Sequence, residues 1–153
     1  MSGAATKTFT VEQANRMLPL VRRIVRDIVD AHRAWARAVQ SFEAAATWTR
    51  ADSPSSQLAA LEAEVRRLAA EIEGYLGELR ELGVEFKGFE QGLVDFPGER
   101  DGRIVYLCWK LDEDEVRFWH EVADGYTGRQ PIEGGNRESG IGNRESGIGN
   151  RES

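Results

Sequence analysis

The chain has 153 residues, of which 41% are hydrophobic and 30% charged, and it carries a net charge of −6. This length predicts about one domain with a modest core, and the acidic balance argues against a protein that binds the phosphate backbone of nucleic acids. No apolar run approaches the roughly 18 residues needed to span a membrane, and residues 1–10 lack the layout of a secretory signal. We therefore expect a cytoplasmic protein. The one cysteine, Cys108, excludes an intramolecular disulfide and any site built from several cysteines.

Two long series of apolar side chains recur in steps of three and four residues. The first begins at Leu18 and ends at Ala46, and the second begins at Leu58 and ends at Leu82. This spacing predicts two amphipathic helices. Residues 47–56 are rich in Ser and include Asp and Pro, which indicates a turn between them. The expected result is a long antiparallel, coiled-coil-like helical hairpin.

The ends of these helices carry recognisable signals. Thr10 precedes Gln13 by three residues, which is the spacing of a capping box and predicts a helix start near Val11. Pro19 predicts a kink or a break soon after, because proline cannot donate a backbone hydrogen bond. Gly83 predicts the end of the second helix.

The first helix is apolar beyond the seam that its partner helix can cover. The additional positions are Ile24, Val29, Ala31, Ala36 and Ala38. Either the C-terminal part of the chain packs on this stripe, or a second copy completes a four-helix bundle. We favour a homodimer.

Beyond Gly83 the period changes from helical to alternating, which predicts β-strands. The predicted strands are residues 84–89, 92–96, 103–111 and 115–122. Turns at residues 97–102 and 112–114 join them into an antiparallel meander. Residues 103–111 are apolar on both alternating sets, so we expect a central strand covered on both faces. The fold class is therefore α+β.

The domain organisation follows from these patterns. Residues 1–83 form the helical hairpin, and residues 84–133 form a sheet packed on it. Residues 134–153 repeat the unit NRESGIG, which has two glycines and one apolar side chain. Such a composition cannot bury a core, so we expect a disordered tail with no role of its own.

Candidate metal ligands gather in the sheet region. Residues 1–83 hold 11 basic and 11 acidic side chains, and residues 134–153 hold three of each, so the whole net charge of −6 falls in 84–133. Within it, the residues that stand out are Asp95, Trp109, His120, Glu121 and Asp124. Carboxylates and a histidine on a small sheet are typical ligands of a divalent metal ion.

The predicted strand register tests this grouping. Pairing Phe96 with Ile104, and Leu107 with His120, places Asp95 and His120 on one face of the sheet with a strand between them. That separation excludes a direct hydrogen bond but allows a bridging ion or ligand. Glu121 then points to the other face, which makes it a weaker candidate ligand.

A structural role is the competing interpretation of these residues. Asp95 could pair with an arginine, for which Arg103, Arg117 and Arg129 are available, and His120 could be a satisfied core histidine. Burial in mid-strand makes Cys108 a core thiol rather than a nucleophile. His32 occupies a seam position, where polar residues more often set the helix register.

Several strings resemble the prokaryotic family named domain of unknown function 2203 (DUF2203). They are FTVEQANRMLPLVRRIV, GVEFKGFEQGLVDFP, GRIVYLCWKL, VRFWHE and GRQPI, and they span about residues 8 to 132. The resemblance implies a small bacterial or archaeal cytosolic protein of uncharacterised function. The signature residues that it implies are Asp95, Trp109, His120, Glu121, Asp124 and Arg129. The repeated tail is not part of the family pattern.

Three functions remain open from the sequence. The first is a non-catalytic homodimer that binds a divalent metal or small ligand through Asp95 and His120, with Glu121, Asp124, Trp109 or Arg129 assisting. The second is a metal-dependent hydrolase or isomerase that uses the same cluster, with a carboxylate as general base. The third is an interaction protein whose helical hairpin contacts a protein partner.

Overall fold

The computed structural model describes residues 7–48 and 55–133. Two helices are followed by a five-stranded antiparallel sheet in the order β1-β2-β3-β4-β5, so the predicted α+β fold is confirmed. The elements are α1 (Val11–Trp48), α2 (Ser56–Leu82), β1 (Glu85–Gly88), β2 (Leu93–Arg100), β3 (Arg103–Lys110), β4 (Phe118–Glu121), the 3-10 turn η1 (Tyr126–Gly128) and β5 (Gln130–Pro131). Strand β3 is central, as its two apolar faces predict.

The helix caps form as the sequence predicts. The Thr10 N–H donates to Gln13 Oε1 at 2.9 Å, and the Gln13 N–H donates to the Thr10 hydroxyl at 3.0 Å. Helix α1 runs unbroken through Pro19, so the alternative of a short helix followed by a long one is wrong. Ser55 caps the start of α2, and Gly83 ends it with φ 88°, a left-handed conformation that glycine adopts without strain.

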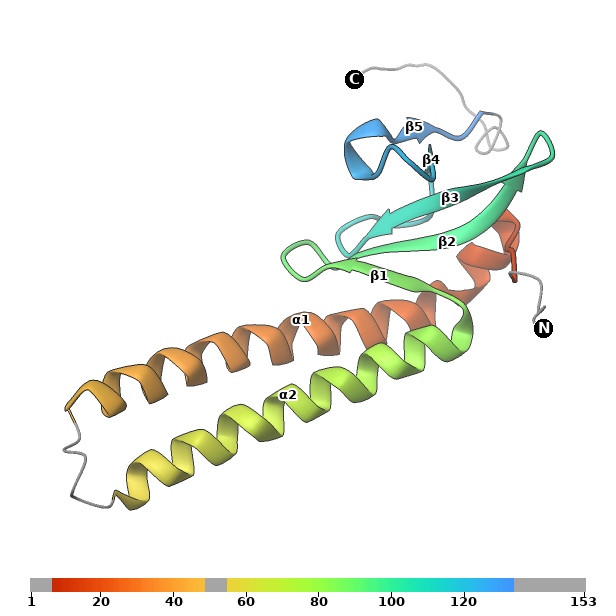
Figure 1. Ribbon diagram of the computed structural model, residues 1–153. Helices are drawn as coiled ribbons and strands as arrows, with labels where there is room; N and C mark the ends of the chain where they lie inside the picture. The colour runs from red at the N-terminus through yellow and green to blue at the C-terminus, as the bar shows by residue number, and fades with distance from the viewer. Residues whose placement is uncertain (1–6, 49–54, 134–153) are drawn as a thin grey trace, which may run out of the picture.

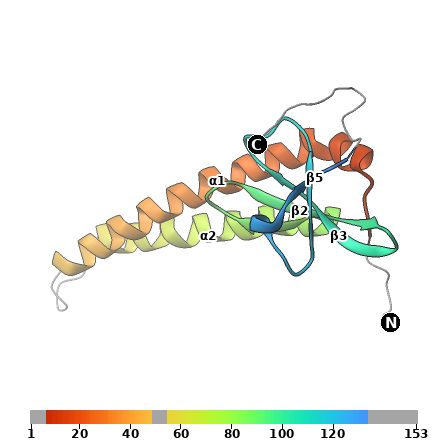
Figure 2. The same ribbon diagram turned by 90° about the horizontal axis from the view of Figure 1, so that it is seen from above.

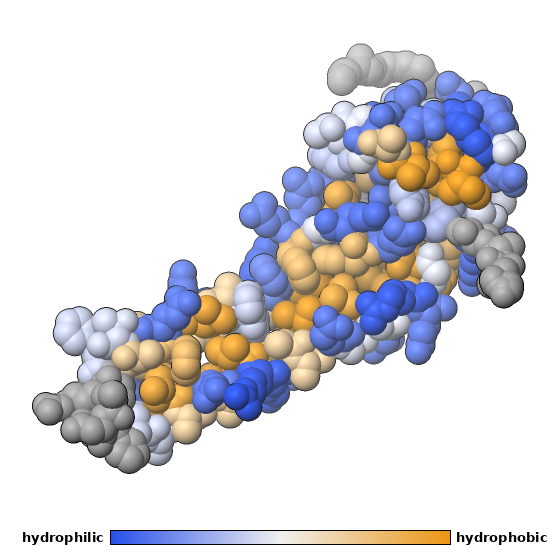
Figure 3. All heavy atoms as spheres, in the orientation of Figure 1, coloured by the Kyte–Doolittle hydropathy of each residue, from blue (hydrophilic) through white to orange (hydrophobic). Residues whose placement is uncertain are grey.

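The two helices form the predicted antiparallel hairpin (Figure 1). Figure 3 shows apolar residues gathered along the seam between them on the visible face. Helix α1 continues to Trp48, which shortens the predicted turn, and residues 49–54 lie outside the described part. The prediction for residues 134–153 also falls on residues that are not described. No helix in the described ranges is long and apolar enough to cross a membrane.

The sheet packs on the N-terminal half of α1, and the other end of the hairpin extends past it (Figures 1 and 2). One face of the sheet contributes Val94, Phe96, Val105, Leu107, Trp109 and Trp119 to a core shared with α1 and α2. The wide apolar stripe of α1 is buried in this arrangement, including Ile24, Val29, Ala31 and Ala38. The structure therefore contains the first alternative, in which the C-terminal part of the chain packs on the stripe. A second copy is not needed to cover these side chains.

The sequence pattern predicted that the second strand ends before Pro97, and this is wrong. Strand β2 continues to Arg100, and a two-residue turn at Asp101 and Gly102, both with positive φ, leads into β3. Proline is tolerated because its carbonyl accepts the Phe9 N–H at 2.8 Å, so its backbone faces away from β3 and no hydrogen bond of that pair is lost. The error shifted the predicted register between these strands.

Strands β4 and β5 also differ from expectation. Strand β4 covers only Phe118–Glu121, within the predicted 115–122, and β5 was not predicted. Two residues are too few for an alternating pattern, so β5 depends on pairing of Phe118 with Pro131 and Trp119 with Gln130.

Candidate metal centre

Asp95, Cys108 and His120 come from three neighbouring strands and lie on one face of the sheet. Asp95 pairs directly with Cys108, and His120 pairs with Tyr106, two residues before Cys108. Because side chains alternate along a strand, all four project from the face opposite the helices. The predicted register is wrong in both strand pairs. Phe96 pairs with Leu107 and not with Ile104, and Leu107 pairs with Trp119 and not with His120. The shared face of Asp95 and His120 is confirmed nonetheless, but the expectation that they lie too far apart for a direct hydrogen bond is wrong, because His120 Nε2 lies 3.1 Å from Asp95 Oδ1.

The three side chains are buried together. Asp95 is 3% exposed, His120 2% and Cys108 0%. One carboxylate oxygen, one imidazole nitrogen and the thiol sulfur lie within 4.8 Å of one another. Within the described residues this is the group of His, Cys, Asp and Glu side chains whose geometry suits a metal ion. The sequence analysis named Asp95 and His120 but took Cys108 only as a core residue.

The hydrogen bonds of His120 define its protonation. Nδ1 lies 2.7 Å from the backbone carbonyl oxygen of Glu121, which can only accept, so Nδ1 carries a hydrogen. Nε2 lies 3.1 and 3.2 Å from the two carboxylate oxygens of Asp95. In a neutral imidazole with a hydrogen on Nδ1, Nε2 has only a lone pair, which repels a carboxylate. The pair therefore requires a cation between Nε2 and the carboxylate, either a proton or a metal ion.

Cys108 is the third group of the cluster whose charged form a bound cation would stabilise. Burial, followed by the negative charge of Asp95, raises the pKa of the thiol to about 12. Burial also raises the pKa of Asp95, against the opposing effect of its contacts with His120 and Cys108. A positive ion between these groups would relieve both effects, because it stabilises thiolate and carboxylate together.

A second layer of polar side chains surrounds the cluster on the same face. The hydroxyl of Tyr106 donates to Glu85 Oε2 at 2.9 Å, and its ring lies 5.5 Å from that of His120. Lys87 contacts Glu85 at 3.1 Å and lies 5.0 Å from the centre of the Tyr106 ring. Tyr106 thus links the ring of His120 to the more exposed pair of Glu85 and Lys87.

Of the other predicted site residues, Glu121, Asp124 and Trp109 lie apart from the cluster, whereas Arg129 lies on its face, beside the cross-strand partner of Cys108. Glu121 points to the opposite face, where Arg103 binds it through two hydrogen bonds. Asp124 is exposed and packs against Gly128. Trp109 is fully buried in the core shared with the helices, and Arg129 stacks on Phe118 at 3.9 Å.

Glu113, predicted from the sequence only as part of a turn, forms hydrogen bonds with several segments of the chain. Its carboxylate accepts hydrogen bonds from Arg129 at 2.6 Å and from the Lys110 backbone at 3.2 Å. Its carbonyl accepts from Trp109 Nε1 at 2.9 Å and from Arg22 at 3.2 Å. These contacts tie the β3–β4 loop to α1 and to the C-terminal segment. No spacing rule could identify them, because the partners are scattered along the chain.

Comparison with known proteins places the chain in a family. The family described as an uncharacterised conserved protein, DUF2203, matches residues 7–132, which is most of the chain. The chain therefore belongs to this family, as the resemblance implied. Neither the curated proteins nor the solved structures contain a match.

Proposed function

We propose that this member of the DUF2203 family is a non-catalytic metal-binding protein that holds one divalent transition-metal ion between Asp95, Cys108 and His120. The observation that carries the proposal is the meeting of three different ligand atoms within 4.8 Å in a buried position. The Asp95–His120 contact, which requires a proton or a metal ion between its partners, is compatible with the proposal.

The ligand types select the metal. A thiolate, an imidazole nitrogen and a carboxylate oxygen together suit Zn²⁺, whereas Mg²⁺ and Ca²⁺ prefer all-oxygen sites. The Glu121 carbonyl orients His120 by accepting its Nδ1 hydrogen, which is the usual supporting contact of a metal-bound histidine. Three protein ligands leave a fourth position for water or another small ligand.

Charge balance favours exchange of protons for a metal ion. Without metal, one proton held between Asp95 and His120, together with a neutral thiol, leaves the cluster neutral. With Zn²⁺, a carboxylate, a neutral imidazole and a thiolate make a neutral cluster again, and two protons are released. Keeping the buried charge at zero avoids the large cost of an uncompensated charge in the interior.

The burial of all three ligands favours binding over catalysis. A metal-dependent hydrolase or isomerase must expose a coordination position to its substrate. Here Tyr106 and the surrounding side chains cover a cluster whose members are at most 3% exposed. The enzyme hypothesis would require this cover to move.

The test is a titration of metal-free protein with Co²⁺, which reports a thiolate ligand by a charge-transfer band in the near ultraviolet. We expect the parent to bind one equivalent of Co²⁺ and the charge-transfer band to vanish in Cys108→Ser. The affinity for Co²⁺ should fall by at least tenfold in His120→Ala. Glu121→Gln and Asp124→Asn are matched controls that should bind as the parent does. Equal binding by all five proteins, with folding verified by circular dichroism, would refute the site.

We further infer that the protein forms a homodimer through its remaining exposed apolar surface. Trp48, at the end of α1, is 86% exposed, an unusual state for so large an apolar side chain. A second copy would cover it. Light scattering should give twice the mass of one chain for the parent and a shift toward the monomer for Trp48→Ser, and a monomeric parent at every concentration would refute the dimer.

A further inference from the structure

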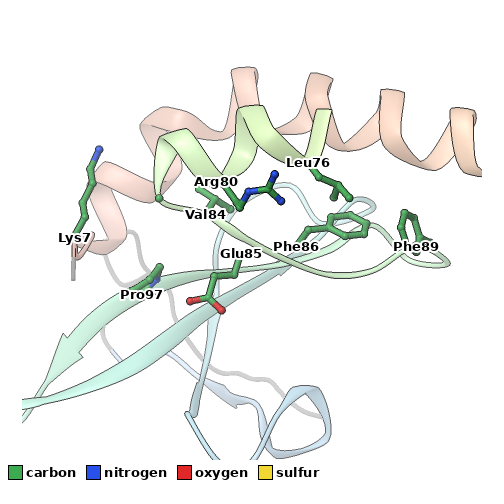
Figure 4. Close-up of a pocket in the computed structure, with 9 residues that line it drawn as sticks. Lys7, Leu76, Arg80, Val84, Glu85, Phe86, Phe89 and Pro97 are labelled. Atoms are coloured by element: carbon green, nitrogen blue, oxygen red, sulfur yellow. The ribbon is translucent and has the colours of Figure 1, made fainter. Parts of the chain in front are cut away.

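A cavity of about 580 Å³ lies between the C-terminal turn of α2, strand β1 and the start of the described chain (Figure 4). Its wall is mostly apolar and includes Leu76, Val84, Phe86, Phe89 and Pro97. This volume falls within the range of pockets that bind small molecules. The cavity is separate from the proposed metal centre, because none of the three metal ligands lines it.

Two cationic side chains at this cavity, Arg80 and Lys7, form no ion pair with any residue that the structure describes. Arg80 is exposed, and in the described part of the chain its guanidinium makes no ion pair or hydrogen bond. Lys7 makes no ion pair with any described residue, and its ammonium lies 5.2 Å from the centre of the Phe9 ring. Figure 4 shows the Arg80 side chain lying alongside α2 in the direction of Leu76, at the edge of the cavity. The cavity therefore combines an apolar wall with unneutralised positive charge, in a chain whose net charge is −6.

Glu85 limits the charge that the cavity can accept. It also lines the cavity, but its carboxylate is already bound by the Tyr106 hydroxyl at 2.9 Å and by Lys87 at 3.1 Å. It is thus unavailable to neutralise Arg80, yet its negative charge disfavours a ligand with two negative charges. A monoanion fits this balance better than a phosphate monoester.

We propose that this cavity binds a monoanionic amphiphile, a carboxylate attached to an apolar chain. The guanidinium of Arg80 would hold the carboxylate through paired hydrogen bonds, a geometry that guanidinium and carboxylate groups share. Lys7 adds positive charge at the edge of the cavity. Leu76, Phe86 and Phe89 would cover the apolar chain, and its removal from water supplies the remaining affinity.

The test is calorimetric titration with octanoate, with its neutral counterpart octanol, and with acetate. We expect octanoate to bind at one site per chain, octanol to bind about tenfold more weakly, and acetate not to bind measurably. Arg80→Gln should weaken octanoate about tenfold and leave octanol unchanged. Arg66→Gln is the matched control, since Arg66 lies on the same helix about 21 Å away and should not affect binding.

Three outcomes would overturn the proposal. The first is the absence of octanoate binding, and the second is equal affinity for octanoate and octanol, which would mean that charge plays no part. The third is an equal loss of octanoate binding in Arg80→Gln and Arg66→Gln, which would indicate a general effect of positive charge rather than a site. All titrations use the full chain, and both variants alter exposed side chains of α2.

Discussion

In the metal-free protein, burial raises the pKa of the Cys108 thiol, and this has a consequence for stability at high pH. Its pKa is about 12 in the folded chain and 9.0 for an unperturbed thiol, because burial and then the charge of Asp95 disfavour the thiolate. The unfolded chain therefore loses this proton first. The stabilising contribution is complete below pH 9 and declines by about 1.4 kcal/mol per pH unit between pH 9 and 12.

Urea unfolding of metal-free protein can measure this effect. Between pH 8 and pH 10.5 the parent should lose about 2 kcal/mol more stability than Cys108→Ala, which lacks the thiol. The other groups that titrate at high pH are common to both proteins and cancel in the difference. Equal losses would show that the thiol ionises as easily in the folded state as in the unfolded chain.

At the scale of elements, the turn between β1 and β2 fixes the sheet to α1. Gly92 has φ 64°, and a Cβ atom there would lie 2.8 Å from Val25 Cγ1 and 2.9 Å from Leu111 Cβ. Gly92→Ala should destabilise the protein by about 2–4 kcal/mol through backbone strain and overpacking. Gly102, with φ 79° and no atom within 4 Å, is the control, and Gly102→Ala should cost only about 1 kcal/mol. Similar unfolding midpoints for the two variants would contradict this packing.

The helices and the order of the strands could be predicted from the sequence, whereas the strand register could not. The helices, their caps and the strand order follow from local periodicity and from residues such as Thr10 and Gly83, which act on their immediate neighbours. The register between β2 and β3 could not be predicted in this way, because Pro97 signals a turn locally but is accommodated by a long-range bond from Phe9. That one error concealed the pairing of Asp95 with Cys108 and hence the third member of the cluster.

In the whole molecule, the two faces of the sheet carry different kinds of side chain. The face toward the hairpin supplies the core, and the opposite face carries the polar cluster of Asp95, Cys108 and His120. On that face the Tyr106 hydroxyl also donates to Glu85 Oε2 at 2.9 Å. With the proposed metal site on the outer face, binding or release of an ion would leave the core on the other face unchanged.

The most direct test of the metal site is the metal content of the native protein, measured by mass spectrometry after purification without an affinity tag or chelator. From the proposed site we expect close to one zinc ion per chain in the parent and in Glu121→Gln, and almost none in Cys108→Ser. A parent that contains no transition metal and does not take up zinc when it is offered would contradict the account, and would leave Asp95 and His120 as a buried pair that shares a proton.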